Sequence, residues 1–196
     1  MVAAPDVSIR LVRLDDTESL SRLETENRDY VLTGAPIRPD EYLTVAGQRA
    51  LIDTLLEKER AGTCAPFVIE VEREVVGRIS LNAIVRGPFH SASIGYWIAE
   101  SAAGRGVVTR ALRLVIEHAF GELGLHRLEA GTTLTNDASA HILTKAGFRQ
   151  FGVAPAYLRI GGRWQDHRMY QLLNDDWTEP AEVSGSAGDE DQVNTR

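Results

Sequence analysis

Apolar and polar residues follow two different periods along the chain. Val7, Ile9 and Leu11 alternate with polar neighbours, and side chains that alternate in this way point to opposite faces of a strand. The same alternation returns in several later stretches. It predicts strands at residues 7–14, two strands within 66–87 that turn at 72–74, a strand at 91–100, a strand at 126–134, and a hairpin over 157–172 that turns on Gly161 and Gly162.

The other stretches repeat apolar residues every three or four positions, which predicts helices. The clearest runs from Gly106 to Gly124, with Val108, Leu112 and Val115 on one face. Further helices are expected at residues 15–32, at 39–62 as one long or two short helices, and at 136–148. The order β-α-α-β-β-β-α-β-α-β-β predicts an α/β (α+β) fold, in which one mixed sheet carries helices on its faces.

The length of 196 residues fits one domain, expected at residues 1–177. Residues 178–196 are acidic and poor in large apolar side chains, so they are expected to form a disordered tail. The net charge of -7 argues against a nucleic-acid binder that works through a broad basic surface.

Residue types that would indicate disulfides, metal centres or membranes are scarce. Cys64 is the only cysteine, and the five histidines lack metal-ligand spacing, so neither a disulfide nor a metal site is predicted. No charged leader precedes an apolar core, and no apolar run reaches the roughly 18 residues of a membrane span. A cytoplasmic protein without a membrane partner is therefore expected.

The stretch "SAAGRGVVTR", residues 101–110, joins a predicted strand to a predicted helix. Acidic residues usually occupy the first turn of a helix, but here Arg105, Arg110 and Arg113 lie in the opening turns, and the first carboxylate after Glu100 is Glu117. Positive side chains at the positive end of a helix dipole are unfavourable unless an anion such as phosphate binds there. The glycines would let such an anion approach the backbone closely. The alternative is that the glycines serve the turn and the arginines are solvated. A nucleotide P-loop and a dinucleotide fingerprint are both excluded by residue identity.

Three longer stretches carry a specific resemblance. "GYWIAESAAGRGVVTRAL", "LGLHRLEAGTTLTNDASAHILTKAGF" and "YLRIGGRWQDHRMYQL" resemble the GNAT acetyltransferase superfamily, and within it the RimJ and RimL ribosomal-protein-alanine N-acetyltransferases. "ENRDYV" and "IVRGPFHSASIGYWI" resemble the RimJ branch in particular, over roughly residues 8–178. The resemblance implies a mostly antiparallel central sheet with splayed middle strands and flanking helices. It also implies acetyl-CoA as co-substrate.

The resemblance implies a set of cofactor contacts. The pyrophosphate is expected on the backbone of the glycine-rich junction, and the pantetheine arm along the strand before it, with further contacts from the short helix after residue 135. These residues are Trp97, Ile98, Ala103, Gly104, Arg105, Gly106, Val107, Val108, Thr109, Asn136, Ser139 and Lys145. An Asn at position 136 with Ser three residues on is also good helix-capping chemistry, and both interpretations can hold.

Acetyl transfer to an amine needs a base, an oxyanion donor and a proton for the leaving thiolate. By resemblance, a backbone N–H near Trp97 or Ile98 is the oxyanion donor, and Ser139, placed by Asn136, supplies the proton. The glutamate proposed as base in the RimL branch is replaced by Ala156.

Other residues are therefore candidates for the base. A turn on Gly161 and Gly162 would set Tyr157 across from Asp166, where the pair could order a water toward the amine. A purely structural Tyr-Asp pair is the alternative. Glu26 and Glu129 are further candidates, and either could equally be a salt-bridged surface residue.

On the acceptor side the resemblance points to Asn27 and Arg28. The loop after them departs from the family pattern, and so does Arg110, which stands where a glutamate is common and is expected to make the mouth of the site more basic.

Three functions remain open from the sequence. The first is acetylation of a protein N-terminus, with an alanine-starting ribosomal protein favoured. The second is acetylation of a small amine such as an antibiotic or polyamine. The third is a CoA-binding module without turnover. A monomer or a homodimer fits each of them.

Overall fold

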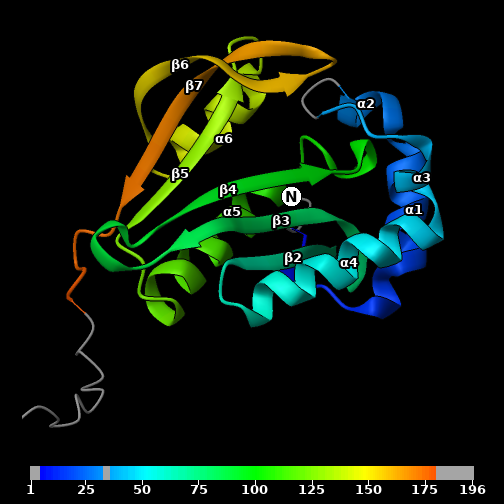
Figure 1. Ribbon diagram of the computed structural model, residues 1–196, viewed down its shortest axis with the longest axis horizontal. Helices are drawn as coiled ribbons and strands as arrows, with labels where there is room; N and C mark the ends of the chain where they lie inside the picture. Colours follow the sequence, from blue (N-terminus) through cyan, green and yellow to red (C-terminus); the bar gives the residue numbers. More distant parts are fainter. Residues whose placement is uncertain (1–4, 33–35, 180–196) are drawn as a thin grey trace, which may run out of the picture.

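The computed structural model describes residues 5–32 and 36–179, drawn as a ribbon in Figure 1. The strands are β1 (Val7–Leu11), β2 (Cys64–Val71), β3 (Glu74–Val85), β4 (Ser91–Ile98), β5 (Arg127–Thr133), β6 (Arg149–Ile160) and β7 (Arg163–Leu173). The α-helices are α1 (Thr17–Glu26), α2 (Arg28–Leu32), α3 (Asp40–Leu43), α4 (Val45–Arg60), α5 (Val107–Glu117) and α6 (Asp137–Lys145). The predicted acidic tail lies almost wholly outside the described residues.

The described strands form one seven-stranded sheet in the order β1-β2-β3-β4-β5-β7-β6. Every neighbouring pair is antiparallel except β4 and β5, which run parallel. β4 and β5 pair only from Ser91–Arg127 to Ser93–Glu129 and then separate. The predicted mixed sheet with splayed middle strands is confirmed.

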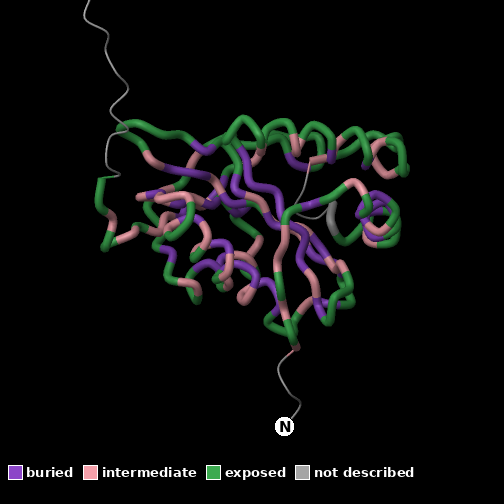
Figure 2. The backbone as a smooth tube through the Cα atoms, turned by 90° about the horizontal axis from the view of Figure 1, so that it is seen from below, coloured by how far each residue is buried: buried purple, intermediate pink, exposed green. Residues whose placement is uncertain are grey.

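Helices cover both faces of the sheet. Figure 1 shows α4 in front of β2 and β3, with α1 and α3 beside it, and α5 and α6 behind the sheet. The larger apolar cluster packs α5 and α6 against one face through residues such as Ile79, Leu112 and Leu128. A smaller cluster around Leu20, Ile52 and Val68 packs α1 and α4 against the other. Figure 2 shows the buried segments gathered in the interior and exposed backbone along the outer helices.

Several predicted boundaries differ from the structure. The strand predicted at 7–14 ends at Leu11, whose side chain is exposed, because the chain turns and buries Val12 in the smaller cluster. The helix predicted at 15–32 breaks at Asn27 into α1 and α2, and the helix after Gly106 changes at His118 to a π-helical turn. The predicted hairpin is longer than expected, since β6 already begins at Arg149.

The helical region over 39–62 folds as two helices, α3 and α4. Thr44 separates them in an extended conformation and caps α4 by accepting from the backbone N–H of Gly47. A Cβ at Gly47 would lie 1.9 Å from the carbonyl oxygen of Glu41, so glycine permits the close approach of the two helices. No helix within residues 5–32 and 36–179 combines the length and apolar character needed to cross a bilayer.

Candidate active site

A cavity of about 730 Å³ lies where β4 and β5 separate, and it is called the cleft below. Its lining comes from β3, β4, β5, the β6–β7 hairpin, α5, α6 and the segment around Tyr30 and Pro36. None of the described lining residues is Asp, Glu, Lys or Arg. On the cleft side, β4 has no strand partner beyond Ser93, so its backbone there is available to a ligand.

The turn before α5 is built on two glycines in the left-handed region, Gly104 with φ 71° and Gly106 with φ 77°. A Cβ at either position would meet no atom within 4 Å, so conformation rather than space requires glycine. Gly106 is the N-cap of α5, and neither a side-chain cap nor an acidic residue occupies the first turn. The positive end of this eleven-residue helix is thus left for an anion.

The other residues of the glycine-rich junction divide by exposure. Arg105 is exposed and Thr109 half-buried, whereas Val107 and Val108 anchor the helix in the core. Arg110 is half-buried, and its guanidinium donates to the carbonyl of Pro5, where α5 packs against β1.

The Ser139 hydroxyl lies in the cleft beside a tyrosine. Asn136 caps α6, with its side-chain oxygen 3.0 Å from the backbone nitrogen of Ser139. The Tyr96 hydroxyl donates to Ser139 Oγ at 3.1 Å. Burial raises the pKa of Tyr96, with the Ser139 hydrogen bond acting weakly against it, so the phenol stays protonated at neutral pH. The pair therefore forms a protonated relay at the cleft wall.

Trp97 and Ile98 end β4 at the far side of the cleft. Trp97 lines the cleft, and its indole lies 5.9 Å from the Arg78 guanidinium carbon. Ile98 is buried and also lines the cleft. Both residues lie beyond the last β4–β5 pair, where an oxyanion donor from the β4 backbone was predicted.

The hairpin does not bring the Tyr157 hydroxyl and the Asp166 carboxylate together. The β6–β7 register shifts between Ala154 and Leu158, and Ala156 adopts a φ of 46°. Asp166 Oδ1 accepts from the Ala156 backbone at 2.8 Å and so holds this bulge. Tyr157 lines the cleft and packs on His167, with ring centroids 5.4 Å apart.

Asn27 and Arg28 mark the end of α1. Asn27 Nδ2 donates to the Leu23 carbonyl at 2.9 Å, and its Oδ1 accepts from the Glu100 backbone nitrogen at 2.8 Å. Asn27 therefore ties α1 to the segment that leads into the glycine-rich junction. Arg28 forms an exposed ion pair of 2.7 Å with Asp40.

The remaining predicted residues lie outside the cleft lining. Glu26 is exposed, and Glu129 forms a 2.7 Å ion pair with Arg127 on its own strand. Lys145 is exposed in the last turn of α6.

Two further features of the site escaped the sequence analysis. His167 and Gly131 face one another in the cleft, and only the tertiary fold brings β7 against β5. Beside Trp97, buried Glu24 pairs with Arg78 at 3.2 Å, and Arg78 donates to the Tyr42 hydroxyl at 2.7 Å. Burial raises the pKa of Glu24, although Arg78 and Tyr42 act against the rise. This cluster holds α1 and α3 on β3.

Comparison with known proteins decides the family. The model of the acetyltransferase (GNAT) domain matches residues 6–149. The chain belongs to the GNAT acetyltransferase family. It is 38% identical over 179 residues to the probable N-acetyltransferase YjcK of Bacillus subtilis, covering 90% of this chain and 98% of that protein.

Two relatives narrow the GNAT branch. The chain is 30% identical over 172 residues to the ribosomal protein uS5-alanine N-acetyltransferase of Escherichia coli, covering 87% and 89% of the two chains. The structure of Mycobacterium smegmatis RimJ in complex with CoA-disulfide superposes with a TM-score of 0.84 and 31% identity, covering 88% of this chain and 84% of that one. This GNAT protein is an N-acetyltransferase that is similar to RimJ.

Proposed function

We propose that this N-acetyltransferase moves the acetyl group of acetyl-CoA to the α-amino group of a protein that begins with alanine, with a ribosomal protein as the favoured acceptor. The relative from Escherichia coli acts on the alanine of ribosomal protein uS5, as its name states. The observation that carries the proposal is the cleft, which brings the Ser139–Tyr96 relay together with a lining whose described residues include no Asp, Glu, Lys or Arg.

The start of α5, where Val108 lines the cleft, fits a phosphate-bearing ligand. Gly104 and Gly106 free the backbone from side chains, and the uncapped start of α5 supplies N–H donors and a positive dipole. We place the pyrophosphate on residues 103–109 and the pantetheine arm beside Trp97, Ile98 and Asn136. Lys145 would reach the nucleotide only from outside the cleft. Acetyl-CoA supplies the activated acyl group as a thioester.

Ser139 and Tyr96 serve the leaving group. Ser139 Oγ gives a proton to the departing thiolate and is resupplied by the Tyr96 hydroxyl 3.1 Å away. The backbone N–H groups at the end of β4 face the oxygen of the tetrahedral intermediate.

The acceptor side of the cleft favours an acceptor with one amine over an acceptor with several. A polyamine such as spermidine needs carboxylates for its several charges, and the described lining offers none. An N-terminal alanine brings one amine, whose pKa is about 7.7–8.0, and one methyl group. In our proposal Tyr157 contacts this acceptor. Asp166 orients Tyr157 because it holds the bulge at the preceding residue, Ala156. Asn27 and Arg28 position the chain on the acceptor side of the cleft and do not bind the acceptor through a charge.

The experiment measures thiol release from acetyl-CoA with three acceptors: an alanine-starting peptide of a ribosomal protein, the same peptide with a blocked N-terminus, and spermidine. We expect release with the free peptide alone and a gain of one acetyl group at its N-terminus by mass spectrometry. Ser139→Ala should lower kcat by about 10²-fold at unchanged acetyl-CoA affinity. Transfer to spermidine but not to the peptide would select the small-amine function, and acetyl-CoA binding without transfer to any amine would indicate a binding module.

A further inference from the structure

The cleft contains one side chain of a type that titrates near neutral pH. The ionisable lining residues in the described part of the chain are His167, Tyr30, Tyr96 and Tyr157. Imidazole exchanges protons near pH 6.5, whereas a phenol does so near pH 10. The carboxylates considered from the sequence are engaged elsewhere or exposed: Asp166 on Ala156, Glu129 on Arg127, and Glu26 at the surface.

The imidazole of His167 is held through Nδ1 by a backbone carbonyl, which leaves its other ring nitrogen, Nε2, outside this contact. It is 3% exposed, and its Nδ1 lies 3.0 Å from the carbonyl oxygen of Gln165. A carbonyl can only accept, so Nδ1 carries the hydrogen and Nε2 keeps its lone pair in the neutral ring. Among the described residues no hydrogen-bond partner reaches Nε2.

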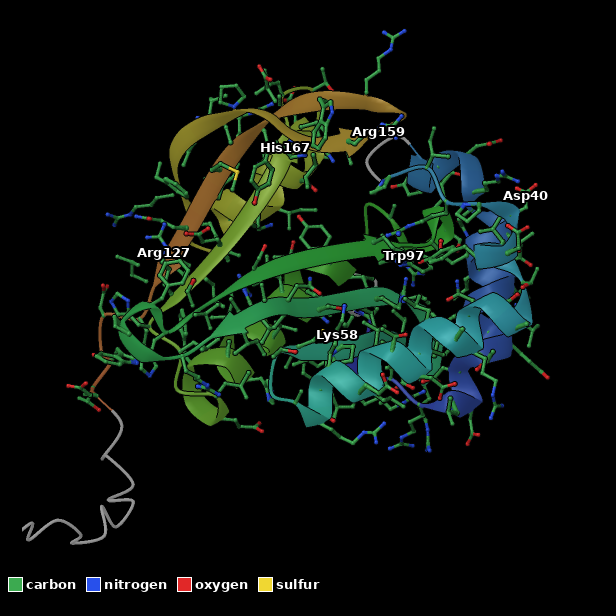
Figure 3. All side chains as sticks on the ribbon, in the orientation of Figure 1. Asp40, Lys58, Trp97, Arg127, Arg159 and His167 are labelled. Atoms are coloured by element: carbon green, nitrogen blue, oxygen red, sulfur yellow. The ribbon has the colours of Figure 1, made fainter. Side chains whose placement is uncertain are left out.

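Gly131 gives the imidazole its place against β5. A Cβ at Gly131 would lie 3.5 Å from His167 Cδ2 and 3.7 Å from Tyr157 Cε1, so both rings converge on the bare strand. Gly131 lies two residues beyond the last β4–β5 pair, where the cleft has opened. Figure 3 shows His167 on the β7 side of the cleft and Trp97 on the β4 side.

His167 and the Ser139–Tyr96 relay occupy opposite faces of the sheet. Neighbouring residues of a strand point to opposite faces, and Arg168 bonds Asp137 of α6 while Tyr170 joins the core under α5. His167 therefore faces away from α6. Tyr96 packs in the same core as Tyr170 and bonds Ser139 of α6. The two groups thus flank the cleft from its two sides.

We propose that His167 is the proton acceptor for the attacking amine, an inference that rests on the proposed function. As the new C–N bond forms at the thioester carbon, Nε2 takes a proton from the amine nitrogen. The C–S bond then breaks, and the sulfur takes its proton from Ser139. On product release the imidazolium returns its proton to solvent, and the Ser139–Tyr96 pair regains one. Tyr157 holds the ring from β6.

The test compares His167→Asn and His167→Ala with His141→Asn, which changes an exposed histidine of α6. Asn keeps a donor near the position of Nδ1 and removes the base, so we expect kcat to fall about 10²-fold with acetyl-CoA affinity within twofold of wild type. Added imidazole should restore the Ala variant at least tenfold. Pyrazole, a ring of equal size and far weaker basicity, should not. His141→Asn should match wild type.

Two results would overturn the assignment. If the His167→Asn variant keeps the kcat of wild type, the imidazole ring takes no part in proton transfer. Equal rescue by imidazole and pyrazole would show that the ring only fills space. Thermal unfolding of each variant is measured as well, to identify any variant that has lost stability. If wild type itself acetylates none of the amines, the proposed function fails instead, which separates the two failures.

Discussion

Ser139 is held by two hydrogen bonds that serve different ends. Its backbone N–H donates to the Asn136 side chain, which fixes the start of α6, and its hydroxyl accepts from Tyr96 at the cleft wall. In the proposed mechanism, capping and proton supply therefore depend on one short sequence, 136–139. Because burial raises the pKa of Tyr96, its phenol stays protonated and can donate to Ser139.

If Tyr96 acts through Ser139, the effects on kcat of removing the two hydroxyl groups should not be additive. Tyr96→Phe should lower kcat about tenfold, and in the Ser139→Ala background it should cost almost nothing more, because the chain of protons is already broken. Steady-state kinetics of the two single variants and the double variant measure this coupling. Full multiplication of the two effects would mean that Tyr96 does not act through Ser139.

The contiguous motif at 136–139 could be found from the sequence, whereas the position of His167 in the cleft could not. Asn136 and Ser139 are three residues apart, so local capping chemistry already relates them. The role proposed for His167 depends on its contact with Gly131 on another strand and on the separation of β4 from β5. The turn at Gly161 and Gly162 was predicted correctly, but the bulge at Ala156 separates Tyr157 from Asp166.

At the scale of elements, the glycine-rich junction and α5 act as one unit. Two left-handed glycines turn the chain so that the uncapped first turn of α5 faces outward, while Val107 and Val108 anchor it. Asn27 braces the same segment from α1 through the Glu100 backbone. The charge pattern of the sequence predicts an anion site here, which stays a prediction, but the sequence could not show that Arg110 bonds the Pro5 carbonyl just before β1.

Gly106→Ala should weaken both folding and CoA binding. A φ of 77° costs a residue with a Cβ about 1 kcal/mol, and a relaxed turn would misdirect the N–H donors. We expect a loss of about 1 kcal/mol in unfolding free energy by urea titration and an acetyl-CoA affinity about fivefold weaker by calorimetry. Gly121→Ala, at a position with ordinary φ and open space, is the matched control. Unchanged affinity in Gly106→Ala would remove this turn from the CoA site.

At the scale of the whole molecule, the two parts of the sheet meet at one end only. Three residue pairs join β4 to β5, and just beyond β7 the chain reaches Trp177. The Trp177 indole donates to the Gly124 carbonyl at 2.9 Å and packs near His90 and His126. Trp177 thus ties the segment after β7 to the loops that precede β4 and β5.

Ending the chain after residue 179 should change neither stability nor kcat/KM, whereas Trp177→Ala should lower the unfolding free energy by about 2 kcal/mol through lost ring contacts and one hydrogen bond. Calorimetric melting of the truncated and substituted proteins, with the transfer assay on both, measures this. A large fall in Tm or activity on truncation would place the acidic segment within the functional unit.

The separation of β4 from β5 has a consequence for how this protein meets other chains. It creates two strand edges inside the sheet, and bare edges commonly recruit foreign strands and lead to aggregation. Here residues of the hairpin, α2 and α6 line the cleft beside those edges, so they limit the room for a whole strand from another molecule. A slender chain of amides needs less room. Compounds that present two or three amide groups on a thin backbone are therefore the natural starting point for inhibitors of this enzyme.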